Sequence, residues 1–174
     1  MKMKTLITLT AALALGAASV LPATAGIIQL EATLDEAQAN AGAGTGSPAT
    51  GSATMTLDDV TNLFSWEISW SELLGDLTVA HFHGPAGPGV NAGVEVDFLT
   101  IAPGNPSVGS TVISAEQATD LLAGLWYINV HSTEFPAGEI RGQVTLSSDV
   151  PAPATIALFG LGLAGLGWSR RKAA

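Results

Sequence analysis

The sequence predicts an all-β domain, a β-sandwich or Greek-key barrel with one short helix, flanked by an N-terminal signal helix and a C-terminal hydrophobic helix. Seven short segments alternate apolar with polar residues, which is the period of a half-buried strand. Turn-forming residues separate these segments at short intervals, as in sandwiches and barrels. A single segment has the start and stop signals of a helix.

The predicted strands cover residues 28–35, 51–57, 64–70, 77–83, 94–98, 126–131 and 139–146. The third strand is the clearest, because large apolar side chains alternate with Ser and Glu along it. Its apolar face includes Trp66 and Ile68, which we therefore expect in the core. Turn residues 58–62 join this strand to the preceding one, so the two should pair as a hairpin.

The predicted helix covers residues 114–122. Ser114 can cap its first turn, and Gln117 completes a capping box with it. Gly124 stands where the end of a helix favours glycine. Between the strands, residues 37–50 and 84–89 are rich in small residues, glycine and proline, and are predicted to be loops.

The charges exclude two classes of partner. All fifteen acidic residues lie between Glu31 and Asp149, and Arg141 is the one lysine or arginine among them. A domain this acidic is repelled by nucleic-acid phosphates and by anionic lipid surfaces. The chain has no cysteine, which excludes disulfides, a thiol nucleophile and thiolate metal ligands.

The N-terminus has the three parts of a secretory signal peptide. Two lysines in the first four residues precede an apolar stretch over residues 6–21. Ala23 and Ala25 then fit the small-x-small rule for signal peptidase, so cleavage should leave Gly26 as the new N-terminus. The alternative interpretation is an uncleaved membrane anchor.

The C-terminus has its own three-part pattern, which consists of Val150, Pro151 and Pro153, an apolar run over residues 156–168, and the bases Arg170, Arg171 and Lys172. The run is short for a transmembrane segment and contains four glycines. A buried core helix is the alternative, but the glycines disfavour a soluble helix and the bases are typical of a stop-transfer signal.

This tail resembles the PEP-CTERM sorting signal, with Ala152 where that family usually has Glu. The resemblance implies processing by an exosortase, a transient inner-membrane anchor, and a final place at the cell surface or outside the cell. It also implies extracellular polysaccharide or surface proteins as partners. The chain then divides into a signal peptide (1–25), a β domain (26–149) and a sorting tail (150–174).

Three histidines are the most informative polar residues of the β domain. His81 and His83 lie two residues apart and point to one face of their strand. His131 lies on the polar face of a later strand, opposite Ile128 and Val130. If those strands are neighbours, the three imidazoles form a ligand set for Cu or Zn. The alternative is that they are structural and bond to loop backbones.

Arg141 also projects from the polar face of its strand. As the only base of the acidic domain, it is expected to form an ion pair with Glu139 or Glu134. No Gly-rich phosphate loop, Ser-centred elbow or zinc-type motif pair is present in the sequence, so no catalytic residue is assigned.

The blocks 81–86, 127–131 and 135–143 resemble the CHRD domain, and the similarity extends over about residues 28–146. The resemblance implies an immunoglobulin-like β-barrel and a non-enzymatic binding or structural role. A more distant similarity is to Cu/Zn superoxide dismutase. It implies that His81, His83 and His131 are metal ligands and that Arg141 guides an anion.

The dismutase resemblance has clear departures. The bridging histidine, the zinc loop and the disulfide of that family have no counterpart in this sequence, and the acidic surface would repel superoxide. The sequence therefore predicts a non-enzymatic, exported, surface-directed CHRD module. A Cu- or Zn-binding, dismutase-like domain is the alternative.

Overall fold

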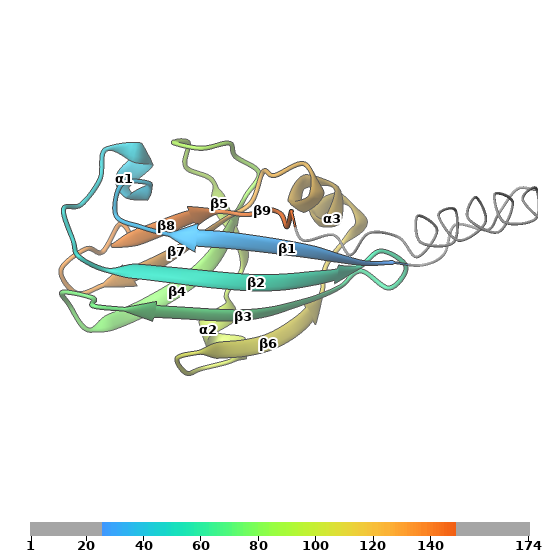
Figure 1. The fold of residues 1–174 in the computed structure, drawn as a ribbon, viewed down its shortest axis with the longest axis horizontal. Helices are drawn as coiled ribbons and strands as arrows, with labels where there is room; N and C mark the ends of the chain where they lie inside the picture. Colours follow the sequence, from blue (N-terminus) through green and yellow to red (C-terminus); the bar gives the residue numbers. More distant parts are fainter. Residues whose placement is uncertain (1–25, 149–174) are drawn as a thin grey trace, which may run out of the picture.

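The computed structural model describes residues 26–148 (Figure 1). The predicted cleavage residues Ala23 and Ala25 and the predicted sorting tail (150–174) lie outside these residues. Within them, the fold is a sandwich of two antiparallel sheets, as the sequence predicted. The first sheet has the strand order β6-β3-β2-β1-β9, and the second has the order β5-β4-β7-β8.

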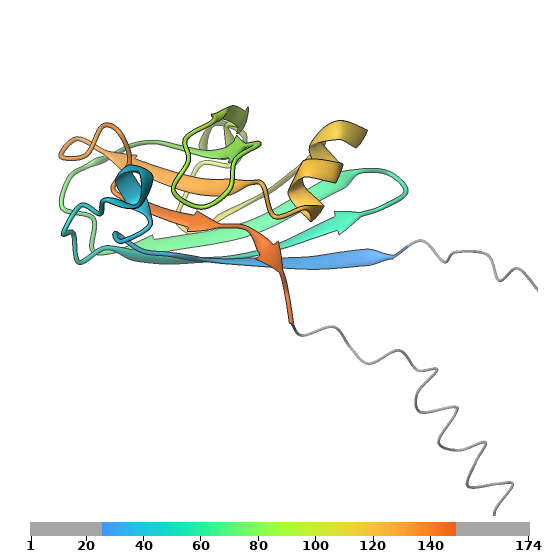
Figure 2. The same cartoon turned by 90° about the horizontal axis from the view of Figure 1, so that it is seen from above.

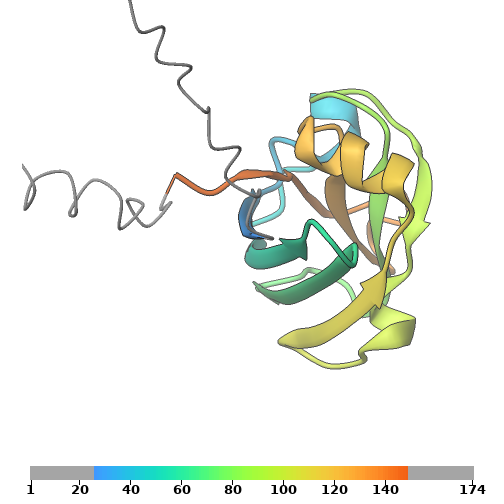
Figure 3. The same cartoon turned by 90° about the vertical axis from the view of Figure 1, so that its right-hand side faces the viewer.

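The first sheet contains β1 (Ile27–Leu34), β2 (Thr50–Asp58), β3 (Leu63–Ser71), β6 (Ser107–Val112) and β9 (Thr145–Leu146). The second contains β4 (Leu77–Gly84), β5 (Gly93–Val96), β7 (Tyr127–Ser132) and β8 (Ile140–Gln143). Within the described residues the helices are short: α1 (Ala39–Gly42), α2 (Phe98–Ile101) and α3 (Ala115–Leu122). Helix α3 lies across one end of the sandwich (Figure 3).

An aromatic cluster fills the space between the sheets. Phe64 of β3 and Phe82 of β4 have their ring centroids 5.0 Å apart, in an edge-to-face arrangement that aromatic pairs favour. Trp126 packs on both rings. Trp66 and Ile68 are buried, which confirms the core face predicted for this strand. Strands β2 and β3 pair as the predicted hairpin, with Met55 opposite Trp66.

The local predictions are partly corrected. Helix α3 has the predicted capping box, in which Ser114 and Gln117 bond each other's backbone N–H groups. However, the helix is not alone among the described residues, because α1 and α2 add one turn each. The strand predicted over 94–98 ends at Val96, since the Asp97 side chain accepts a hydrogen bond from the Thr100 N–H and caps α2.

Two further corrections concern edge strands. Strand β6 was not predicted at all, although it forms one edge of the first sheet. The predicted strand 139–146 is divided in two, because the chain passes from the second sheet to the first at Val144. Strand β9 then pairs with β1, with Leu146 opposite Leu30. The Leu146 side chain is exposed.

The segment Gly84–Ala92, which starts at the last residue of β4, covers the outer face of the second sheet (Figure 2). A second loop carries α1 and lies beside the edge strand β8, where the Gln38 Oε1 atom accepts a hydrogen bond from the Gln143 N–H. The loops touch each other, since a Cβ built on Gly42 would lie 3.8 Å from the Gly89 Cα atom. Among residues 26–148, no helix has the length and apolar character that a membrane span needs.

Candidate metal centre

Strands β4 and β7 bring the three histidines together. The strands are antiparallel neighbours, with His81 opposite Asn129 and Val79 opposite His131. Because alternate residues of a strand share a face, His81 and His83 project from the outer face of the sheet beside His131. The sequence predicted the strand face of each histidine, but only the structure shows that the two strands are neighbours.

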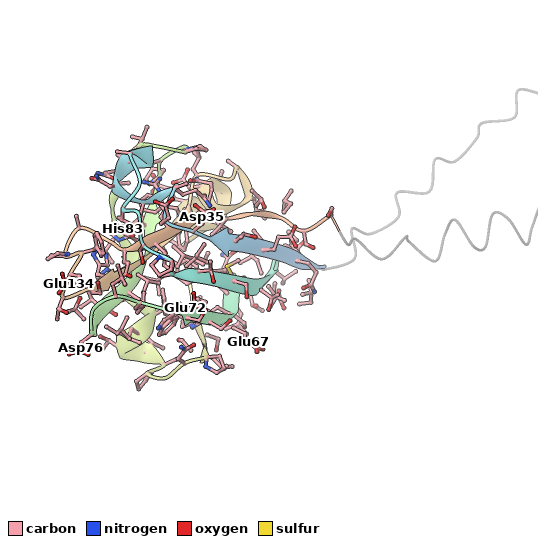
Figure 4. All side chains as sticks on the ribbon, turned by 60° about the vertical axis from the view of Figure 1, so that its left-hand side comes forward. Asp35, Glu67, Glu72, Asp76, His83 and Glu134 are labelled. Atoms are coloured by element: carbon pink, nitrogen blue, oxygen red, sulfur yellow. The ribbon has the colours of Figure 1, made fainter. Side chains whose placement is uncertain are left out.

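The three imidazoles form one compact group. One ring nitrogen from each of His81, His83 and His131 can be chosen so that all three lie within 4.8 Å of one another. The ring centroid of His81 is 5.5 Å from that of His83 and 5.5 Å from that of His131. His83 is buried, and the other two rings are partly exposed. Figure 4 places His83 inside the outline of the domain, whereas Asp76 and Glu134 lie at its rim.

Backbone carbonyl groups orient two of the rings. The Nδ1 atom of His83 lies 3.1 Å from the Ala92 carbonyl oxygen, and the Nδ1 atom of His131 lies 2.9 Å from that of Pro136. A carbonyl oxygen only accepts, so each Nδ1 carries the proton and each Nε2 keeps its lone pair. This arrangement is typical of metal-binding histidines, whose other nitrogen is held by a carbonyl or carboxylate.

Two ring nitrogens of the group are buried without a hydrogen-bond partner among residues 26–148: Nδ1 of His81 and Nε2 of His83. Buried polar atoms are seldom unpaired, because each lost hydrogen bond costs about 1–3 kcal/mol. A metal ion bound by these atoms would remove the cost.

The electrostatic environment favours neutral imidazoles. Burial lowers the pKa of His83 from its usual 6.5, against the opposing effect of the hydrogen bond to Ala92. Burial also lowers the pKa of His81, partly offset by the Asp97 carboxylate. Only a neutral imidazole offers a lone pair to a metal ion, so these shifts favour the metal-binding form of His81 and His83 at neutral pH.

Arg141 does not make the ion pair predicted from the sequence. It is 2% exposed, and no carboxylate within residues 26–148 pairs with it. Its guanidinium instead donates to the Val90 carbonyl at 2.9 Å and more weakly to two groups nearby, the Gly87 carbonyl at 3.4 Å and the Asn91 side chain at 3.3 Å. Arg141 therefore holds the Gly84–Ala92 loop on the sheet.

Tyr127 links Arg141 to the histidine group and was not singled out from the sequence. The guanidinium carbon of Arg141 lies 3.4 Å from the Tyr127 ring centroid, and the His83 ring stacks on the same tyrosine. The Tyr127 hydroxyl accepts a hydrogen bond from the Ala92 N–H at 3.0 Å. His83 and Tyr127 thus bind the two backbone groups of one loop residue.

Glu139, predicted from the sequence as a possible ion-pair partner of Arg141, has other partners in the structure. It is fully buried, and one carboxylate oxygen accepts from Ser47 Oγ at 2.5 Å and from the Leu74 N–H at 2.7 Å. Burial raises the pKa of Glu139, but hydrogen bonds, first that from Ser132 and then that from Ser47, outweigh burial and hold the pKa below its usual 4.5. The carboxylate ties two loops to the start of β8.

Comparisons with known proteins bear on the family and on the tail. The model of the CHRD domain matches residues 30–144, which is more than half of the chain. The PEP-CTERM protein-sorting motif matches residues 149–172. No curated protein and no solved structure matches the chain.

Neither matching family is enzymatic. The sorting motif implies export, a transient membrane anchor and processing by an exosortase-type system before the protein reaches the surface or the exterior. The histidine blocks singled out from the sequence lie within the span of the first match. The chain therefore belongs to the CHRD domain family and carries a C-terminal PEP-CTERM sorting motif.

Proposed function

We propose that this exported protein is a non-enzymatic binding module whose CHRD domain holds one Zn²⁺ or Cu²⁺ ion through His81, His83 and His131. After sorting, its neighbours are the extracellular polysaccharide and the proteins of the cell surface. The observation that carries the metal proposal is the pair of buried, unpartnered ring nitrogens within a group of three imidazoles.

The chemistry of the donors suits these two ions. Imidazole nitrogen is a favoured ligand of both zinc and copper, and the group contains neither thiolate nor thioether. Hard ions such as Mg²⁺ and Ca²⁺ prefer oxygen ligands. Three protein ligands leave a fourth position for water or another small ligand.

A structural role without metal is the competing explanation. Hydrogen bonds from His83 to Ala92 and from His131 to Pro136 hold loops in place, as a staple would. Those bonds use only the Nδ1 atoms, and they leave the second nitrogen of His83 buried and unpaired. A staple alone therefore explains the Nδ1 contacts of His83 and His131, but it does not explain the buried, unpartnered Nδ1 of His81 and Nε2 of His83.

Dismutase activity is not part of the proposal. A second group of three metal-ligating side chains is absent from residues 26–148, so the paired copper and zinc sites have no counterpart there. Arg141 is buried under the loop that it binds, where it cannot meet an incoming anion.

Equilibrium dialysis against zinc or copper, followed by elemental analysis, tests the proposal. The protein should retain about one ion per chain, and His83→Ala should retain none. The chain has three histidines in all, so no other imidazole can substitute. Glu67→Gln, which removes an exposed carboxylate from the other sheet, is the control and should bind as the parent does. Metal retained equally by the His83→Ala chain would show that carboxylates, not this site, bind it.

A further inference from the structure

The three histidines differ in whether the ring nitrogen that would bind a metal ion already has a hydrogen-bond partner. Nε2 of His83 has no hydrogen-bond partner among the described residues, whereas Nε2 of His131 has one. That partner is the side-chain amide of Asn129, whose Nδ2 atom lies 3.2 Å away. Asn129 and His131 are two residues apart on β7 and share its outer face.

The direction of this hydrogen bond follows from a second contact. The same Nδ2 atom lies 3.1 Å from the carbonyl oxygen of Ala137. Because a carbonyl oxygen only accepts, the nitrogen end of the amide must face Ala137. The second N–H of the amide then points at His131, whose Nε2 accepts it. The proton on Nδ1 of His131, donated to Pro136, gives the same assignment independently.

The amide has little room to move aside. A Cβ built on Gly138 would clash sterically with the Asn129 Oδ1 atom, so the amide packs directly against this glycine backbone. Asn129 is also 8% exposed, and water reaches little of it. Rotation of the amide away from His131 would break both of its hydrogen bonds at once.

We propose that Asn129 sets the metal affinity of the site, an inference that rests on the proposed function. In the metal-free protein the Asn129 amide donates a hydrogen bond to the Nε2 lone pair of His131, which is the lone pair that a metal ion would need. Metal binding therefore has to break this hydrogen bond and leave a buried N–H without its partner. His81 and His83 bind the ion first, and His131 completes the site at a cost. The result is a weaker and more exchangeable site than three free imidazoles would make.

Zinc titration of the full-length protein against a competing chelator tests this role. Asn129→Leu removes both side-chain N–H groups and keeps a side chain of similar size. This variant should bind zinc roughly two- to tenfold more tightly than the parent, because the net free energy of one hydrogen bond corresponds to such a change in affinity. Asn129→Ala serves the same purpose if leucine disturbs the contact with Gly138. The control is Gln29→Leu, which replaces an exposed amide on β1 of the other sheet. It touches no histidine and should leave the affinity unchanged.

Nitrogen-15 NMR supplies a readout of the hydrogen bond itself. A scalar coupling between Nδ2 of Asn129 and Nε2 of His131 should be present in the metal-free protein and vanish when zinc is added. Zinc binding of equal or lower affinity in both folded Asn129 variants would overturn the inference and leave the proposed function intact. Failure of zinc to bind any of these chains would overturn both.

Discussion

The imidazole ring of His83 lies parallel to the phenol ring of Tyr127, with their centroids 5.0 Å apart and 6° between their planes. The guanidinium of Arg141 lies over the same phenol ring. These side chains come from β4, β7 and β8, and each of them also bonds the Gly84–Ala92 loop. The candidate metal ligand is thus fixed by the stack and the loop together.

Replacing Arg141 with lysine should loosen this loop. A lysine ammonium keeps the charge but is a point donor, so it cannot reproduce the planar contacts with the loop and with Tyr127. Loss of hydrogen bonds to a charged group should lower the free energy of unfolding by about 1.5–3 kcal/mol. Urea titration measures the loss, and faster hydrogen exchange at the Ala92 amide locates it. An unchanged exchange rate at Ala92 would show that Arg141 does not hold the loop.

Trp66→Ala should destabilise the core. Trp66 is 3% exposed, and it packs on Phe64, Phe82 and Phe98. Truncation of a buried tryptophan to alanine typically costs about 3–5 kcal/mol, which denaturant titration would measure. The matched control is Val112→Ala, whose side chain is 66% exposed and which should change stability by less than about 0.5 kcal/mol. Similar losses for the two variants would contradict the assignment of the core face.

Glu139 should make the stability of the domain depend on pH in the acid range. Its pKa in the folded protein is below the usual 4.5, so the unfolded chain binds more protons between these two values. The contribution of Glu139 is therefore fully present above about pH 4.5 and is lost as the pH falls through the lowered pKa.

Glu139→Gln tests this dependence. The variant should be less stable than the parent at pH 7, and the difference should shrink when both are measured at pH 3. Glu67→Gln, on the exposed face of β3, is the control and should change little at either pH. A difference between Glu139→Gln and the parent that stays constant from pH 7 to pH 3 would refute the carboxylate role.

Processing of both ends should be visible in the mass of the mature protein. The Ala23 and Ala25 pattern predicts an N-terminus at Gly26, and the sorting motif predicts loss of the tail that follows Val150. Intact mass spectrometry of the protein recovered from its native host measures both. Retention of residues 1–25 would contradict the signal peptide, and retention of the basic tail would contradict removal by an exosortase.

Alternation was sufficient to predict most strands of the sandwich, and it failed where the pattern is inverted. In β6 the inward-facing positions are Ser107 and Gly109, while Val108 and Val112 face outward. The reason is the bulk of Trp66 on the neighbouring strand. A Cβ on Gly109 would lie 2.7 Å from the Trp66 ring, so no large side chain fits there. An edge strand without an apolar inner face has no signal in the sequence.

The candidate site was predictable only as separate strand faces. The alternation of faces along each strand placed His81, His83 and His131 on polar faces. The structure brings the three together because β4 pairs with β7. Alternation could not show that loops cover this face, which buries Tyr127, Asn129 and Arg141 as well. The charge balance predicted a carboxylate partner for Arg141, although its partners are loop carbonyls more than fifty residues earlier in the sequence.

X-ray absorption spectroscopy of the zinc-loaded protein tests the central claim most directly, because it counts the imidazoles bound to the ion. The account predicts three imidazole nitrogens at about 2.0–2.1 Å, with one further light ligand from solvent. In the His83→Ala protein this signature should disappear. A zinc shell made of carboxylate and water oxygens, without the outer scattering of imidazole rings, would contradict the claim that His81, His83 and His131 form a metal site.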